Sequence, residues 1–136
     1  MVKRGAGMTS GEKLLGAERA FACDIDDKAV DVAYENAALN GVDRERYAVR
    51  AGDVLSDAGL RKEMGTGYDV VVANIVSDVI IALAPAVRGL MKEGGRFLAS
   101  GIIDSREEEV RAALEAAGLA VEEARASEGW VSFLCR

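Results

Sequence analysis

Short apolar runs alternate with helix-like segments along the chain, and this alternation limits the folds that the sequence can adopt. The clearest run, Tyr68–Asn74, holds three consecutive valines and suits a strand buried on both faces of a sheet. Further strands are expected at 19–24, 47–51 and 96–100. Helices are expected at 27–40, 55–64 and 77–91, the last restarting at Pro85. The pattern predicts an α/β domain with a mostly parallel sheet.

The C-terminal part of the chain breaks this alternation. Ser105 and Glu108 have the spacing of a capping box, which predicts a helix that ends at Gly118. Two strands, at 119–124 and 129–135, then follow with a turn between them and no helix. Consecutive strands joined by a turn form an antiparallel hairpin. A dinucleotide-binding domain would continue with βαβ units, so the hairpin favours the methyltransferase variant of the Rossmann-like sheet.

Composition excludes several classes of function. The chain has 136 residues, one domain's worth, with a formal net charge of −6. An acidic domain repels phosphate backbones, so we expect no direct nucleic-acid partner, and a basic protein substrate suits the charge better. No apolar stretch is long enough for a membrane helix and no signal peptide is recognisable, which favours a cytoplasmic protein.

Two cysteines and no histidine limit the chemistry further. A Ser-His-Asp or Cys-His mechanism needs an imidazole, and the chain has none. Two isolated thiols do not make a usual zinc site, so no metal is expected. Both Cys23 and Cys135 lie in apolar runs, which predicts buried, reduced thiols.

Three polar residues stand where predicted strands end: Asp24, Asp53 and Asn74. Ligands of open α/β sheets bind beyond the carboxyl ends of the strands. At such a position the carboxylate of Asp24 suits the two hydroxyls of a ribose, although an acid there also favours a helix N-terminus. Asp53 suits an adenine amino group, with the backbone N–H of Val54 reading a ring nitrogen. A turn or capping role for Asp53 is equally open.

Asn74 ends the most apolar strand of the chain. Its carboxamide offers both a donor and an acceptor, so it could position an amine nucleophile or hold a cofactor. The alternative is an ordinary residue of a strand-end turn.

Several runs occur in an order that resembles one enzyme family. They are Ala22–Asp26, Glu35–Gly41, Val71–Ile75, Gly101–Asp104 and Glu128–Val131. Together they are similar to the C-terminal catalytic domain of the PrmA family of ribosomal protein methyltransferases, over roughly residues 13–136. The asparagine motif and the Gly-Trp-Val ending are the most specific parts of this resemblance.

The resemblance implies a class I methyltransferase fold, with S-adenosyl-L-methionine as cofactor and amino groups of a large-subunit ribosomal protein as substrate. It implies that Asp24 binds the ribose, Ile25 packs on the adenine, and Asp53 with Val54 reads the adenine. Asn74 matches the asparagine of the family's active site, as a catalytic and cofactor-binding residue. The expected chemistry is direct displacement by a neutral amine, which relies on positioning more than on a strong base.

The start of the chain departs from the family. From the sequence we expect no recognition domain before the fold, and an opening strand with its glycine-rich loop that is missing or degraded. Gly5 is the nearest match to the loop, although Lys3 stands where the family has an acid. We therefore expect a single catalytic domain over 1–136, incomplete at its N-terminus, that self-associates through unpaired strands. A non-catalytic remnant of the fold and a small-molecule methyltransferase are the competing interpretations.

Overall fold

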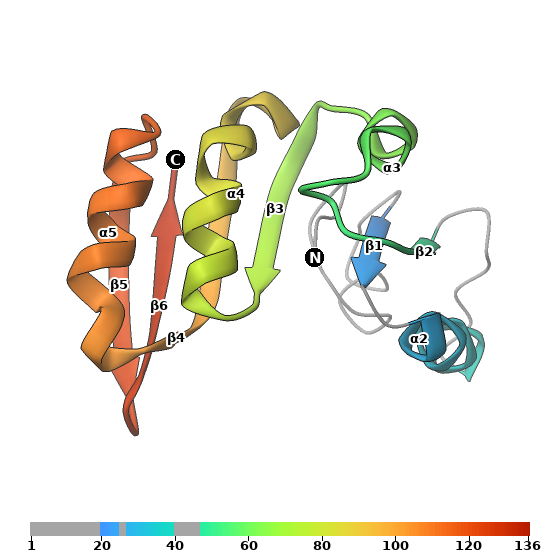
Figure 1. The fold of residues 1–136 in the computed structure, drawn as a ribbon, viewed down its shortest axis with the longest axis horizontal. Coiled ribbons are helices and arrows are strands. Elements are labelled where there is room, and N and C mark those ends of the chain that lie inside the picture. Colours follow the sequence, from blue (N-terminus) through green and yellow to red (C-terminus); the bar gives the residue numbers. More distant parts are fainter. Residues whose placement is uncertain (1–19, 25–26, 40–46) are drawn as a thin grey trace. The chain divides into compact units, whose positions relative to one another are not determined.

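The structure is a computed structural model that describes residues 20–24, 27–39 and 47–136 of the chain. The chain divides into two compact units, Met1–Gly65 and Thr66–Arg136. Figure 1 shows the elements of both units, with colours that follow the sequence from blue to red.

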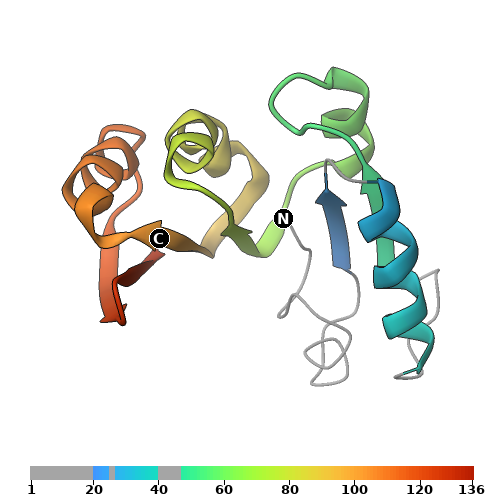
Figure 2. The same ribbon diagram turned by 60° about the horizontal axis from the view of Figure 1, so that its bottom comes forward.

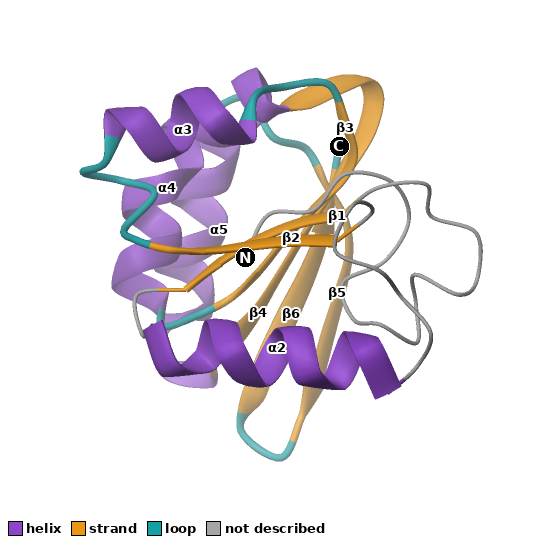
Figure 3. Ribbon diagram, turned by 90° about the vertical axis from the view of Figure 1, so that its right-hand side faces the viewer, coloured by secondary structure: helices purple, strands orange, loops and turns teal. Residues whose placement is uncertain are grey.

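The first unit is built on a pair of parallel strands. The strands are β1 (Ala20–Asp24) and β2 (Tyr47–Ala51), and the helices of this unit are α2 (Asp27–Leu39) and α3 (Ala58–Met64). Residues pair in register from Ala20 with Tyr47 to Asp24 with Ala51, so the two carboxyl ends lie side by side. Helix α2 runs alongside the strand pair, as Figure 3 shows. It packs Val30, Ala33 and Tyr34 against the buried Ala22 and Val49.

Tyr34 of α2 ties the helix to the main chain of β2. Its hydroxyl accepts a hydrogen bond from Val49 N at 2.9 Å and donates to Val49 O at 3.1 Å. Arg50 Nη1 also donates to this hydroxyl, at 3.0 Å, while Arg50 Nε pairs with Glu63 Oε1 of α3 at 2.6 Å. The hydrogen bond to Glu63 raises the pKa of Arg50. This network joins α2, β2 and α3 through one tyrosine and one arginine.

The second unit contains a four-stranded sheet in the order β3-β4-β6-β5. Its strands are β3 (Tyr68–Asn74), β4 (Met91–Ile103), β5 (Val121–Ser127) and β6 (Trp130–Cys135), and its helices are α4 (Ser77–Leu90), the short 3₁₀ helix η1 (Asp104–Arg106) and α5 (Glu107–Ala116). Strands β3 and β4 are parallel, whereas β6 is antiparallel to both of its neighbours. Figure 2 shows α4 and α5 on the same face of this sheet.

The core of the second unit lies between these two helices and the sheet. Fully buried side chains come from both layers: Val71, Phe97 and Phe133 from the strands, and Val87 and Leu114 from the helices. Burial of side chains of this size stabilises a fold by roughly 1.5–3 kcal/mol each. The apolar periodicity of the sequence therefore corresponds to a real packed layer.

The predicted hairpin is confirmed, and its turn explains why it forms. Ser127 pairs with Trp130, so the loop contains only Glu128 and Gly129. Both have positive φ, 52° and 84°, as a two-residue type I′ hairpin requires. Glycine adopts this conformation without strain, and Glu128 is the only described residue other than glycine with positive φ.

Several local predictions are wrong, among them three in the second unit. Helix α4 does not restart at Pro85 but runs through it, because Pro85 lies on the exposed side, where water can satisfy the carbonyl that lost its partner. Strand β4 begins at Met91, not Arg96. Met91 already pairs with Tyr68 of β3, and Gly94 and Gly95 lie in an irregular stretch of the strand rather than in a turn before it.

The third wrong prediction concerns the start of α5. The helix begins at Glu107 after the 3₁₀ turn, and no side chain caps it. Arg106 instead pairs with Glu109 at 2.6 Å and with Asp78 of α4 at 2.7 Å, which links the two helices. The hydrogen bond from Arg106 lowers the pKa of Glu109. The hydrogen bonds to Glu109 and Asp78 raise the pKa of Arg106.

Within the described part of the chain, no helix combines the length and the apolar character needed to cross a membrane.

Candidate functional site

The first unit brings two of the predicted site positions to one edge of its sheet. Asp24 is the last residue of β1 and pairs with Ala51, the last residue of β2. Asp53 follows two residues later on the chain. Because the strands are parallel and in register, the main chain at Asp24 and at Asp53 lies at the same carboxyl edge. The predicted residues Gly5 and Ile25, and the side chain of Asp24, lie outside what the structure describes.

Asp53 forms a turn after β2. Its Oδ1 accepts a hydrogen bond from Leu55 N at 2.9 Å, and its carbonyl accepts from Ser56 N and Asp57 N. This is the turn role that the sequence left open beside the adenine role. The other carboxylate oxygen of the exposed Asp53 has no hydrogen-bond partner among the described residues, and neither has the backbone N–H of Val54. One acceptor and one donor are thus available side by side, the pair that an adenine edge requires.

Gly52 holds the chain close to α3 before this turn. It has φ +151°, and a Cβ there would lie 2.9 Å from Leu60 Cδ2. Helix α3 is itself fixed by Asp57, whose Oδ1 accepts from Leu60 N at 2.9 Å. This cap places the start of α3 later than the predicted Leu55. The turn that carries Asp53 and Val54 is therefore supported from both sides.

The second unit places Asn74 at the carboxyl end of β3. Asn74 pairs with Ser100 of β4 and is exposed, whereas Val71, Val72 and Ala73 before it are buried. Its carboxamide has no hydrogen-bond partner among the described residues. A polar group that is both unpartnered and exposed at the end of a buried strand is available to a ligand.

Gly101, which the sequence analysis gave no role, lies against Asn74. A Cβ at Gly101 would be 2.8 Å from Asn74 Oδ1 and 3.1 Å from Ile75 O. Gly101 also has φ +80°, and Ser100 O accepts a hydrogen bond from Ile75 N at 3.3 Å. The absent side chain is what lets β4 approach the asparagine. A glycine directly after an apolar strand was the only signal for it in the sequence.

The chemistry that these groups offer is recognition and positioning. A carboxamide donates and accepts hydrogen bonds but does not take up a proton near neutral pH. The chain has no histidine to act as a general base. Within each unit, the available polar groups stand at the carboxyl ends of parallel strands, where α/β sheets bind their ligands.

Comparison with known proteins gives one consistent family. The family described as "Ribosomal protein L11 methyltransferase (PrmA)" matches residues 5–136. A ribosomal protein L11 methyltransferase from Agathobacter rectalis is 42% identical over 119 residues, which are 87% of this chain and 37% of that protein. The chain thus spans little more than a third of that relative's length.

Solved structures agree on the fold. A ribosomal protein L11 methylase from Lactobacillus delbrueckii superposes with a TM-score of 0.81 at 26% identity, over 93% of this chain and 62% of that one. Fibrillarin from Aeropyrum pernix, in complex with S-adenosyl-L-methionine, superposes with a TM-score of 0.69 at 14% identity, over 100% of this chain and 67% of that one. The likeness to fibrillarin shows a shared class I methyltransferase fold.

Proposed function

The chain belongs to the ribosomal protein L11 methyltransferase family, and we propose that it forms the cofactor-binding and catalytic part of an S-adenosyl-L-methionine-dependent protein methyltransferase. The proposed substrate is an amino group of a ribosomal protein, and the proposed compartment is the cytoplasm. Relatives are much longer than this chain, so recognition of the ribosomal protein is assigned to sequence outside it.

The observation that carries this proposal is the carboxamide of Asn74, which is exposed at the end of a buried strand and has no hydrogen-bond partner in the part of the chain that the structure describes. S-adenosyl-L-methionine supplies a methyl group on a sulfonium sulfur. We assign to Asn74 the orientation of the accepting amine, whose lone pair must point at the methyl carbon. Positioning of this kind accounts for much of the rate of a displacement reaction.

The cofactor's nucleoside is assigned to the first unit. No described residue bonds the second carboxylate oxygen of Asp53 or the N–H of Val54, which leaves both groups for the adenine edge. Asp24, at the end of β1 and in register with the end of β2, is assigned to the ribose hydroxyls. Both assignments use the carboxyl edge of the sheet, where class I folds hold their ligands.

Calorimetry with S-adenosylhomocysteine, the stable product of the cofactor, tests the proposal. We expect Asp24→Ala to weaken binding about 10–100-fold, since a charge-assisted hydrogen bond contributes roughly 1.5–3 kcal/mol. Asp27→Ala, which removes the same charge from the first residue of α2, is the matched control and should change affinity less than about threefold.

Three results would contradict parts of the proposal. Wild type and Asp24→Ala with equal affinities would remove the ribose assignment. If S-adenosylhomocysteine does not bind to the chain extended to the relatives' length, the protein is a remnant that keeps the fold without its function. Methylation of small amines, but not of a ribosomal protein, by that extended chain would reassign the substrate.

A further inference from the structure

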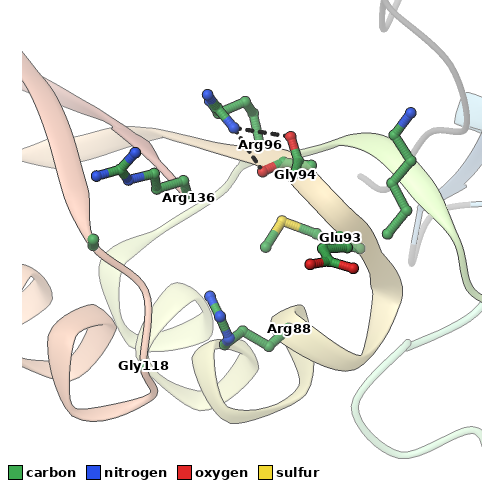
Figure 4. Close-up of a pocket in the computed structure, with 10 residues that line it drawn as sticks. Arg88, Glu93, Gly94, Arg96, Gly118 and Arg136 are labelled. Carbon is green, nitrogen blue, oxygen red and sulfur yellow. Dashed lines mark hydrogen bonds between the residues drawn. The ribbon is translucent and has the colours of Figure 1, made fainter.

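A cavity of about 650 Å³ opens in the second unit, at the opposite end of β3 and β4 from Asn74. It lies where β4 begins and where β6 ends. Figure 4 shows the residues that surround it, among them Arg88, Glu93, Gly94, Arg96, Gly118 and Arg136. It is therefore separate from the strand ends to which we assign methyl transfer.

Positive charge gathers around this cavity although the chain as a whole has a net charge of −6. Arg88 comes from α4, Lys92 and Arg96 from β4, and Arg136 from the residue after β6, whereas Glu93 is the one acid of the lining. The acids that pair with these cations, Asp69 and Glu122, stand outside the lining. The lining itself therefore holds four cationic side chains and one acidic side chain.

Two arginines of the cavity depend on the same carboxylate, although Arg96 Nη1 also donates to the backbone carbonyls of Gly94 and Gly95, at 2.8 and 3.3 Å. Arg96 and Arg136 are cross-strand neighbours, because the preceding residue Cys135 pairs with Phe97. They share one carboxylate, that of Glu122, at 3.2 and 3.3 Å. Like charges in neighbouring positions across a sheet destabilise it, so a further anion beside Arg96 and Arg136 would reduce their repulsion. It would also accept hydrogen bonds from guanidinium N–H groups that Glu122 does not reach.

Arg88 has no hydrogen-bond or ion-pair partner among the described residues. Its side chain nevertheless packs over Gly118, where a Cβ would lie 3.3 Å from Arg88 Cδ. Gly118 has φ +85° and ends the turn after α5. A larger residue there would press on the arginine stem, so Gly118 leaves room for Arg88 beside the cavity.

We propose that this cavity binds the phosphate group of an organic phosphate ester. Guanidinium groups from several elements match the oxygens of a phosphate, which accepts paired hydrogen bonds from an arginine fork. The volume exceeds that of one phosphate several-fold, which leaves room for the organic part of an ester. The proposal does not depend on the methyltransferase assignment.

Nuclear magnetic resonance of the ¹⁵N-labelled chain tests this directly. The probes are glycerol 3-phosphate, a monoester, and uridylyl-uridine, a diester, because neither contains the adenine for which the cofactor site is proposed. We expect saturable shifts of the Gly94 and Gly118 amides, weakened about tenfold in Arg88→Gln. The matched control Arg125→Gln removes an arginine that pairs with Glu123 on β5, away from the cavity, and should leave binding unchanged.

Each outcome decides between the alternatives. Binding of the monoester alone identifies a free phosphorylated metabolite, and binding of the diester identifies a nucleic-acid backbone; both support the phosphate site. Arg136→Gln, a change in another element, should weaken binding as Arg88→Gln does. The proposal is overturned if neither ester gives saturable shifts at the cavity, if Arg125→Gln weakens binding equally, or if citrate binds as well as the esters.

Discussion

Replacing Gly101 by alanine tests whether this glycine makes room for Asn74. Two separate costs are expected. Alanine at φ +80° is strained by about 1–2 kcal/mol, offset by about 0.4–1 kcal/mol because the unfolded chain becomes less free. The new methyl group would also stand 2.8 Å from Asn74 Oδ1 and 3.1 Å from Ile75 O. Crowding of this kind costs about 1–3 kcal/mol, so we expect a total loss near 2–4 kcal/mol.

Two other glycines separate these costs. Gly67 and Gly94 have φ +82° and +79°, but a Cβ at either would meet nothing within 4 Å. Gly67→Ala and Gly94→Ala therefore carry the backbone cost alone, about 1 kcal/mol net. The difference between them and Gly101→Ala isolates the contact with Asn74 and Ile75.

Urea unfolding followed by tryptophan fluorescence measures these losses. Trp130 is the chain's single tryptophan and lies in the second unit, so its emission reports the unit that contains Gly101. The double variant Asn74→Ala, Gly101→Ala should recover part of the loss, because alanine lacks the crowded oxygen. The reasoning is refuted if Gly101→Ala is no more destabilising than the two control variants, within about 0.5 kcal/mol.

Three further predictions concern catalysis, a buried thiol and the open strands. In the chain extended to its relatives' length, Asn74→Ala should lower single-turnover methylation more than cofactor affinity; an unchanged rate would make Asn74 merely structural. Burial raises the pKa of Cys135 to about 11. Because the folded state favours the protonated thiol, the contribution of Cys135 to the free energy of unfolding is fully present below about pH 9. It is lost as the pH rises toward 11. In Cys23→Ser, a thiol reagent at about pH 8 should label the chain only in urea; rapid native labelling would contradict this. The isolated chain should bind cofactor weakly and self-associate, because β1 and β3 each have one strand partner among the described residues. An upstream strand and glycine-rich loop should raise stability and affinity, whereas a monomer melting above about 60 °C with micromolar affinity would refute this.

Sequence reasoning worked best where one physical signal dominated. The valine run of β3 gave the bounds Tyr68–Asn74, because a strand buried on both faces needs apolar residues throughout. The final hairpin was predictable because Gly129 supplied a turn residue directly before the apolar strand β6.

The remaining features depended on contacts that sequence spacing does not contain. Pro85 is tolerated inside α4 because of the side of the helix on which it lies. Ser105 does not cap α5 because it lies inside the 3₁₀ turn Asp104–Arg106, so that Arg106 stands at the N-cap position. The candidate site shows the same division. Asp53 and Asn74 were found as strand-end polar residues, whereas the sequence offered for Gly101 only a glycine after an apolar strand, and its closeness to Asn74 came from the structure.

The tyrosine that binds β2 has a consequence for aggregation. An exposed strand edge recruits other chains through its unpaired N–H and C=O groups. Tyr34 occupies both such groups of Val49 with a single hydroxyl, on the edge of β2 that faces away from β1. An incoming strand would have to break both hydrogen bonds and displace Arg50 as well. These hydrogen bonds therefore protect this edge of β2, and Tyr34→Phe should open it to self-association.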